Sequence, residues 1–324
     1  MNYIVLDLEW NQAADMKTKL SHELVFEIIE IGAVKLNEQM QQIDAFHELI
    51  KPQVFHKMHQ ITGELIHLTI EQLQNCRVFP EVAQDFVAWC GEDCVFCTWG
   101  NLDLLELQRN MDYYKMTPLS EKPIQFYDVQ KLFSIAFEDK KLRRTLEFAT
   151  DYLQIEKDIA FHRADSDAYY TALVLQKMNN SDVLMNYSFD TYRIPRSKKD
   201  EVHIRFAEYE KYISRGFLDK MSAMEDREVV STRCYLCRTS MKKKVRWFTT
   251  NGKHYYAIAH CEKHGLFKGK IRMRKTLTGQ VYVVKTIKPV SEEIMEDILQ
   301  KKEQAKAIRR EKRQREHDKK RDGK

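Results

Sequence analysis

Two acidic residues lie within the first apolar run of the chain, YIVLDLEW, where Asp7 and Glu9 are separated by one residue. Side chains two residues apart on a strand lie on the same face, so these carboxylates are expected to project together. Like charges placed side by side repel, and burial raises their cost unless a cation lies between them. Carboxylate oxygens are the ligands that Mg²⁺ and Mn²⁺ prefer. The pattern predicts a divalent-metal site, with two solvated charges on an edge strand as the alternative.

Three further ionisable residues stand at the expected ends of buried elements. Asp103 follows the apolar run DCVFCTWG, where a helix is expected to begin. His162 precedes the helical stretch ADSDAYYTALVLQKM, and Asp167 comes five residues later. Taken singly, each has an ordinary explanation, because aspartate caps helices and acids favour a first helical turn. What weighs against these explanations is the ordered set of four acids and one histidine, each at the end of a buried element.

These residues resemble the three sequence motifs of the DEDDh 3′-to-5′ exonucleases. The resemblance covers about residues 1–180 and includes IIEIGAVKLN and HQITGELI. TWGNLD is most similar to the branch that contains the histone-mRNA and small-RNA trimming exonucleases and the bacterial KapD-like proteins. The chain differs at Trp10, where the family often has a threonine. Asp165 also lies near Asp167 but misses the family spacing, so we take Asp167 as the motif residue.

The resemblance implies a site, a reaction and a substrate. Two Mg²⁺ or Mn²⁺ ions would be bound by the four acids, and His162 would activate the attacking water. The substrate class would be single-stranded RNA or DNA with a free 3′ end, releasing 5′-mononucleotides, with RNA slightly favoured by TWGNLD. The alternatives are a DNA exonuclease in repair or proofreading and a non-catalytic nucleic-acid-binding adaptor. The implied metal ligands are Asp7, Glu9, Asp103 and Asp167.

The elements expected around these residues define an α/β fold. The strand-like runs YIVLDLEW, FEIIEIGAVKLN and AFHELIKP follow one another closely, which predicts an antiparallel meander. Strand-like and helical stretches alternate after them, which predicts a mixed sheet with helices on both faces. The resemblance implies that this sheet is ribonuclease-H-like.

A second metal site is indicated by cysteines in the second half of the chain. Cys234-x-x-Cys237 and Cys261-x-x-His264 are separated by twenty-three residues that are rich in strand formers. Two such pairs make a closed tetrahedral zinc site, so we predict a zinc ribbon. The alternative is two buried thiols with an incidental histidine, and His260 is the rival fourth ligand. By contrast, Cys94-x-x-Cys97 lies within an apolar strand whose cysteines would face opposite sides, and we interpret both as core residues.

The chain is expected to divide into an exonuclease domain (1–180), a helical linker (181–230), a zinc-ribbon-like module (231–290) and a basic helical tail (291–324). Residues 301–324 hold twelve Lys or Arg against five Asp or Glu, a net charge of +7. The formal net charge is +5, so the remainder carries 5 − 7 = −2. A basic tail is typical of proteins with a polyanionic partner.

Basic residues also alternate with aromatic residues in the zinc-ribbon-like module, a pattern that suits phosphate contacts and base stacking. For Trp247 and Phe248, a place in a small core is an equally good interpretation. The basic residues are Lys242, Lys243, Lys244, Arg246, Lys268, Lys270, Arg272, Arg274 and Lys275.

Composition narrows the class of protein further. The chain has 324 residues, 43% of them hydrophobic, which suffices for one sizeable core and a smaller module. No apolar run approaches the roughly eighteen residues that would span a bilayer, and no signal-peptide pattern opens the chain. The seven cysteines, an odd number, argue against a disulfide framework. We therefore expect an intracellular, cytoplasmic protein.

Overall fold

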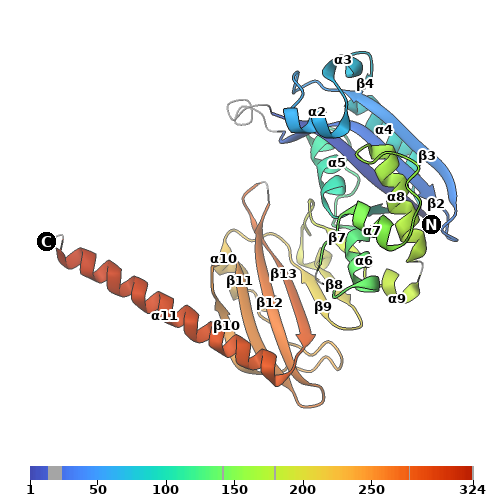
Figure 1. Ribbon diagram of the computed structural model, residues 1–324. Coiled ribbons are helices and arrows are strands. Elements are labelled where there is room, and N and C mark those ends of the chain that lie inside the picture. The colour runs from blue at the N-terminus through green and yellow to red at the C-terminus, as the bar shows by residue number, and fades with distance from the viewer. Residues whose placement is uncertain (14–23, 141, 179, 277, 323–324) are drawn as a thin grey trace. The chain divides into compact units, whose positions relative to one another are not determined.

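The computed structural model describes residues 1–13, 24–140, 142–178, 180–276 and 278–322. The chain divides into two compact units, Met1–Arg193 and Ile194–Lys324. Each unit has its own β-sheet (Figure 1), and each is described by itself below.

The first unit is built on a seven-stranded sheet with the strand order β4-β3-β2-β1-β5-β6-β7. The first three strands form an antiparallel meander, and β5 and β6 continue the sheet in parallel beyond β1. The mixed sheet expected from the sequence is thereby confirmed. The strands are β1 (Asn2–Gln12), β2 (Phe26–Leu36), β3 (Gln42–Lys51), β4 (Arg77–Val78), β5 (Cys94–Thr98), β6 (Ile124–Asp128) and β7 (Ser188–Asp190).

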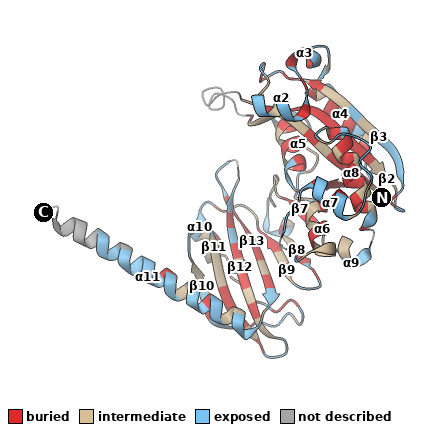
Figure 2. Cartoon of the chain, viewed as in Figure 1, coloured by how far each residue is buried: buried red, intermediate tan, exposed pale blue. Residues whose placement is uncertain are grey.

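Helices cover both faces of this sheet (Figures 1 and 2). The helices α4 and α5 pack on one face against Leu6 and Leu8, whereas α6, α7 and α8 pack on the other against Val5. Cys97 packs in the second cluster and Cys94 against the first, so these cysteines are core residues on opposite faces, as predicted. The helices are α2 (Gln60–Ile66), α3 (Ile70–Leu73), α4 (Phe79–Cys90), α5 (Leu102–Tyr113), α6 (Val129–Phe137), α7 (Leu146–Tyr152), α8 (Ala164–Lys177) and α9 (Ser181–Leu184).

The second unit is built on a six-stranded antiparallel sheet with the order β10-β11-β12-β13-β9-β8. A turn with Gly252 at φ +69° joins β10 to β11, where Asn251-Gly252 predicts a hairpin. The elements are a 3₁₀ helix (Lys198–Asp200), β8 (Val202–Arg205), β9 (Glu210–Ile213), α10 (Lys220–Glu225), β10 (Lys242–Thr249), β11 (His254–Cys261), β12 (Gly265–Lys275), β13 (Val281–Pro289) and α11 (Glu292–Asp322).

The expectation of a helical linker over 181–230 is wrong. Residues 181–193 belong to the first unit, where β7 pairs with β6. The stretch RFAEYEKYISRGFLDKM (205–221) has the apolar spacing of a helix. Within it, however, β9 pairs with β13, and only α10 at its end is helical. Phe206 and Tyr209 stack at 4.5 Å across the tight turn between β8 and β9. Their spacing of three residues imitates a helix, but pairing with a distant strand decides the conformation.

The last helix, α11, packs on the second sheet through its first turns. Ile298 is buried against Val245 and Ile258, and Met295 packs beside it. These two apolar residues at the start of the tail contact the sheet, whereas Leu299 beside them is exposed. Residues 323 and 324 of the predicted tail lie outside the described residues. Among the described helices, none combines the length and apolarity needed to cross a membrane.

Candidate active site and metal centres

Three of the predicted acids meet at one face of the first sheet. Asp7 and Glu9 project from β1 toward the start of α8, which carries Asp167 in its first turn. One carboxylate oxygen from each residue lies within 4.8 Å of the others, and all three side chains are half-buried. The strand alternation predicted for YIVLDLEW therefore places both β1 acids on the α8 side.

Glycine allows this close approach between helix and sheet. Gly32 is the Cα partner of Asp7 on β2. A Cβ atom at Gly32 would lie 2.1 Å from the carbonyl carbon of Ala164, at the start of α8. Any larger residue would therefore push α8, and Asp167 with it, away from β1.

Asp103 and His162 complete the predicted set. Asp103 lies in the first turn of α5, is only 6% exposed, and interacts electrostatically with Asp7. His162 immediately precedes the α8 N-cap, and its side chain is exposed. Its backbone is left-handed (φ +67°), and its backbone N–H donates to Asp167 Oδ1 at 3.3 Å. The structure thus brings the four acids together and puts the histidine beside them.

The electrostatics of the acids suit a bound cation. Burial, followed by repulsion from Asp167 and other acids, raises the pKa of Glu9 to about 8. Burial is also the main cause that raises the pKa of Asp103 to about 7 and that of Asp167 to about 6. Burial and the neighbouring Asp103 raise the pKa of Asp7 as well. Clustered oxygen donors that repel one another when ionised fit a hard divalent ion.

This cluster predicts how the stability of the metal-free protein depends on pH. A carboxyl group with a raised folded-state pKa stabilises the fold below its usual pKa near 4, and this contribution is lost as pH rises through the folded pKa. In EDTA, we expect the melting temperature to fall as pH rises through about 6, 7 and 8, the values for Asp167, Asp103 and Glu9. This dependence of the melting temperature on pH is measured by thermal unfolding, with circular dichroism as the signal.

Two controls accompany that measurement. Mn²⁺ should reduce the fall in melting temperature, because a cation removes the repulsion between the ionised acids. Glu9→Gln should make the fall in melting temperature smaller, because the variant lacks the carboxyl group with the highest of the three pKa values. A melting temperature in EDTA that stays constant from about pH 5 to 8.5 would contradict the expectation.

Trp10 lies on the opposite face of β1 from the two acids. It packs against the cluster that contains Leu6 and Leu8, and its ring centroid lies 5.4 Å from that of Phe26. The tryptophan that distinguishes this chain from the usual motif therefore contributes to the core beneath α5.

The structure also reveals a group that sequence reasoning missed. Glu30 on β2 lies beside the predicted site and contacts His47 of β3 and Arg163 at the start of α8. Glu30 and His47 could bind a metal together with Asp165. However, the Arg163 guanidinium already contacts both oxygens of Glu30. Two features of the sequence could have indicated this group: Glu30 lies inside an apolar strand, and Arg163 directly follows His162.

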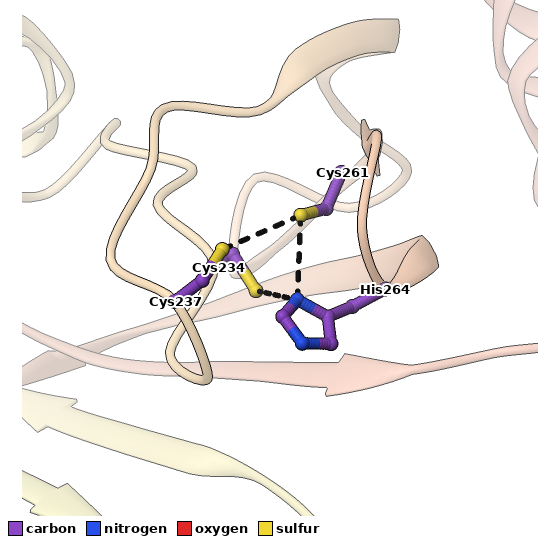
Figure 3. A group of neighbouring side chains, drawn as sticks. All are labelled: Cys234, Cys237, Cys261 and His264. Atoms are coloured by element: carbon purple, nitrogen blue, oxygen red, sulfur yellow. Dashed lines mark hydrogen bonds between the residues drawn. The ribbon is translucent and has the colours of Figure 1, made fainter.

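The four predicted zinc ligands of the second unit also lie together (Figure 3). Cys234 Sγ and Cys261 Sγ lie 3.5 and 3.6 Å from His264 Nδ1, and Cys237 Sγ lies 3.6 Å from Cys261 Sγ. A tetrahedral zinc ion, about 2.3 Å from sulfur and about 2.0–2.1 Å from nitrogen, holds its ligand atoms roughly 3.5–3.8 Å apart. The arrangement therefore fits zinc. The rival ligand, His260, lies on β11 outside this group.

The local structure around the first cysteine pair favours metal binding. Cys234 and Cys237 lie on a tight turn in which Arg238 N–H donates to the carbonyl of Cys234 at 2.7 Å. A hydrogen bond with the Thr239 hydroxyl is the main cause that lowers the pKa of Cys237 to about 6. A thiol that ionises below neutral pH is a ready metal ligand.

Comparisons with known proteins define the class to which the first unit belongs. The family model of the RNase_T exonucleases matches residues 4–175, which is more than half of the chain. The chain therefore belongs to this exonuclease family. No curated protein gives a significant match.

Several solved structures are similar to parts of this chain. The nuclease domain of 3′hExo, a DEDDh family member bound to rAMP, is 18% identical with a TM-score of 0.47, covering 55% of this chain and 90% of that one. Cell-death related nuclease 4 is 17% identical with a TM-score of 0.46, covering 74% and 87%. E. coli exonuclease I in complex with a dT13 oligonucleotide is 10% identical with a TM-score of 0.48, covering 84% and 55%.

Proposed function

We propose that the first unit is a divalent-metal-dependent exonuclease that hydrolyses single-stranded nucleic acid from its 3′ end and releases 5′-mononucleotides. The observation that carries the proposal is the convergence of acids from β1, α5 and α8 beside an exposed histidine. Membership of the exonuclease family supports the reaction class.

The residues take separate roles in this proposal. Asp7, Glu9 and Asp167 hold the metal ions, and the buried Asp103 completes the set directly or through water. Two bound Mg²⁺ or Mn²⁺ ions would activate water and stabilise the departing 3′ oxygen. His162 accepts the proton of the attacking water, because histidine is the most common general base in enzymes and this side chain faces solvent.

The substrate is proposed to be RNA in preference to DNA, on the resemblance of TWGNLD alone. A DNA exonuclease in repair or proofreading is the main alternative. A non-catalytic adaptor fits less well, because the chain has all five residues that the proposed reaction requires, and its acids converge with His162 beside them.

One assay tests the proposal and separates its alternatives. The full chain is incubated with 5′-labelled single-stranded RNA, single-stranded DNA and duplex, each with Mn²⁺ or with chelator. We expect a ladder that shortens from the 3′ end, requires the metal and is faster on RNA. A ladder on DNA alone would identify the alternative nuclease, and binding with no cleavage would identify the adaptor.

The second unit presents a row of cations suited to holding a strand. Residues alternate along β12, so that Phe267, Gly269, Ile271 and Met273 are buried whereas the residues between them are basic. Tyr256 of β11 is the Cα partner of Lys270, whose Nζ lies 6.0 Å from its ring. We call this surface the β12 row, and it consists of Lys268, Lys270, Arg272 and Arg274.

Trp247 does not belong to this surface, whereas Phe248 lies on the same face of the sheet, where it is the Cα partner of Tyr256. A Cβ atom at Gly269 would lie 2.5 Å from the Trp247 ring, whose Nε1 donates to the carbonyl of Val230 at 3.0 Å. Phe248 packs in the cluster around Ile298 of α11. Trp247 therefore packs in the core of this unit, which is one of the two interpretations given for it. Phe248 packs against Tyr256 beside the β12 row.

Neutralising the β12 row is expected to weaken nucleic-acid binding in a salt-dependent way. Lys270→Gln/Arg272→Gln should lower the affinity for a single strand, and the slope of log K against log salt should fall by about 0.7 for each phosphate that is no longer neutralised. Fluorescence anisotropy in chelator, without turnover, measures both quantities. Lys198→Gln/Lys199→Gln removes the same charge from the same unit and should have less effect. Equal effects of the two pairs would contradict a localised surface, as would no effect of either.

A further inference from the structure

Opposed residues follow a regular order across the first three strands on the face that bears the acids. Directly opposed residues of an antiparallel pair project to the same side of the sheet. Asp7 of β1 is opposite Gly32 of β2, which is opposite His47 of β3. In the next row, Glu9 is opposite Glu30. Glu30 and His47 therefore share the face on which the proposed metal ligands lie.

Glu30 is the centre of a fully satisfied ionic group. Its side chain is 0% exposed, and its Oε1 accepts from His47 Nε2 at 2.7 Å. The guanidinium of Arg163 contacts both oxygens, with Nε 3.1 Å from each and Nη2 2.8 Å from Oε1. Burial opposes the ionisation of Glu30, but these hydrogen bonds outweigh it and lower the pKa of its carboxyl group. Removing either partner would leave a buried charge uncompensated.

Arg163 connects this group to the residues proposed to react. It is the N-cap residue of α8 and follows His162 directly. Its carbonyl accepts from Asp167 N–H at 2.9 Å, so the first turn of α8 begins at the anchored residue. The side chain thus ties to β2 the turn that carries Asp167 and the left-handed residue His162.

The ion pair with Glu30 fixes the direction of this turn. Gly32 lets α8 approach the sheet, but an absent side chain only permits contact and cannot orient the helix. A two-oxygen contact with a guanidinium sets both distance and angle. Arg163 also acts on Glu9, whose pKa its positive charge lowers against the larger effect of burial.

We propose that Glu30, Arg163 and His47 form a positioning cluster, in which the Glu30–Arg163 pair sets Asp167 and His162 against Asp7 and Glu9. These three residues act through their neighbours and do not themselves ligate metal or touch the scissile bond. The inference rests on the proposed function, because it assigns a purpose to the geometry of that site.

The proposal is tested with Glu30→Gln, Arg163→Gln and Arg163→Lys in the full chain. Outer residues that orient metal ligands typically contribute 10- to 100-fold to activity or metal affinity. We expect Glu30→Gln and Arg163→Gln each to lower kcat by about 10- to 100-fold, with a smaller change in KM. Arg163→Lys should recover part of the loss, because lysine keeps the charge but not the two-oxygen contact.

A second readout does not depend on hydrolysis. Mn²⁺ affinity, measured from the free-ion signal in electron paramagnetic resonance, should fall in the two glutamine variants by about 10-fold or more. The double variant Glu30→Gln/Arg163→Gln should lose no more than either single variant, because both remove one interaction. If the wild-type chain binds Mn²⁺ but hydrolyses no polymer, the proposed function is wrong. The Mn²⁺ affinities of the variants then still test whether the cluster positions the metal ligands.

Glu138→Gln supplies the matched control. Glu138 pairs with Arg144 at 2.7 Å, and its side chain is also largely buried in the same unit. Glu138→Gln should lower the melting temperature without changing kcat or Mn²⁺ affinity of the folded protein. Equal losses of activity in Glu138→Gln and Glu30→Gln would mean that the Glu30–Arg163 pair only stabilises the fold and does not position the site. Unchanged kcat and Mn²⁺ affinity in folded Glu30→Gln, or additive losses in the double variant, would overturn the proposal.

Discussion

Asp7→Asn is expected to abolish hydrolysis of a labelled single strand while the protein stays folded. Asparagine keeps the shape of the side chain but removes the charge that faces Glu9 and Asp167. Metal ions contribute several kcal/mol to stabilising such a transition state, so a lost ligand should cost about 10³-fold or more in kcat. Burial and neighbouring acids raise the pKa of Asp7, so the metal-free variant should be at least as stable as the wild type. Initial rates and thermal unfolding in EDTA measure the two effects.

Two further variants sharpen this prediction. Asp85→Asn makes the same chemical change at an exposed ion pair with Arg77 and should leave the rate unaltered. His162→Ala should lose about 10²- to 10⁴-fold in rate, the range for a general base, yet retain Mn²⁺ affinity because His162 is no ligand in this scheme. A rate for Asp7→Asn close to that of the wild type would remove Asp7 from the reaction.

Cys261→Ser is expected to release a stoichiometric zinc ion and to unfold the region around the two cysteine turns. Cys261 contacts both Cys237 and His264, so its sulfur is central to the group. Zinc binding in small modules contributes apparent free energies of about 10–16 kcal/mol at neutral pH, and the small cluster around Cys234 has few other contacts to replace them. Elemental analysis of the purified chain and limited proteolysis of residues 231–290 measure the loss.

Cys94→Ser is the matched control, because Cys94-x-x-Cys97 has the same spacing as Cys234-x-x-Cys237. Its metal content should equal that of the wild type, since the two side chains belong to opposite faces of the first sheet. Retention of one zinc ion per chain in Cys261→Ser would contradict the site, and a different metal in the wild type would correct its identity.

Local patterns were sufficient for most elements of the first unit. The meander, the buried strand around Cys97 and the helix that carries Asp167 all follow from periodicity over eight to fifteen residues. The same parity argument put Asp7 and Glu9 on one face, and the structure agrees. The group of proposed zinc ligands was recognisable because paired cysteines at this spacing carry a strong signal even without knowledge of the fold.

Conformations that depend on contacts with distant parts of the chain could not be predicted in the same way. The stretch 205–221 has apolar residues at helical spacing, but β9 within it is held by β13, about seventy residues later in the chain. Trp247 could not be assigned until the structure showed its ring against Gly269. In both cases the deciding contact is long-range, and sequence periodicity contains no information about which strand becomes a neighbour.

The sequence by itself determined the chemistry of this protein: which acids, which histidine and which cysteines are available, and in what order they occur. Tertiary structure alone decided how they are held. The contact of α8 with Gly32 and the ion pair of Glu30 with Arg163 join residues more than a hundred positions apart. Side-chain type and local periodicity are properties of short segments, whereas the angle at which a helix meets a sheet depends on packing between segments, which only the folded chain contains.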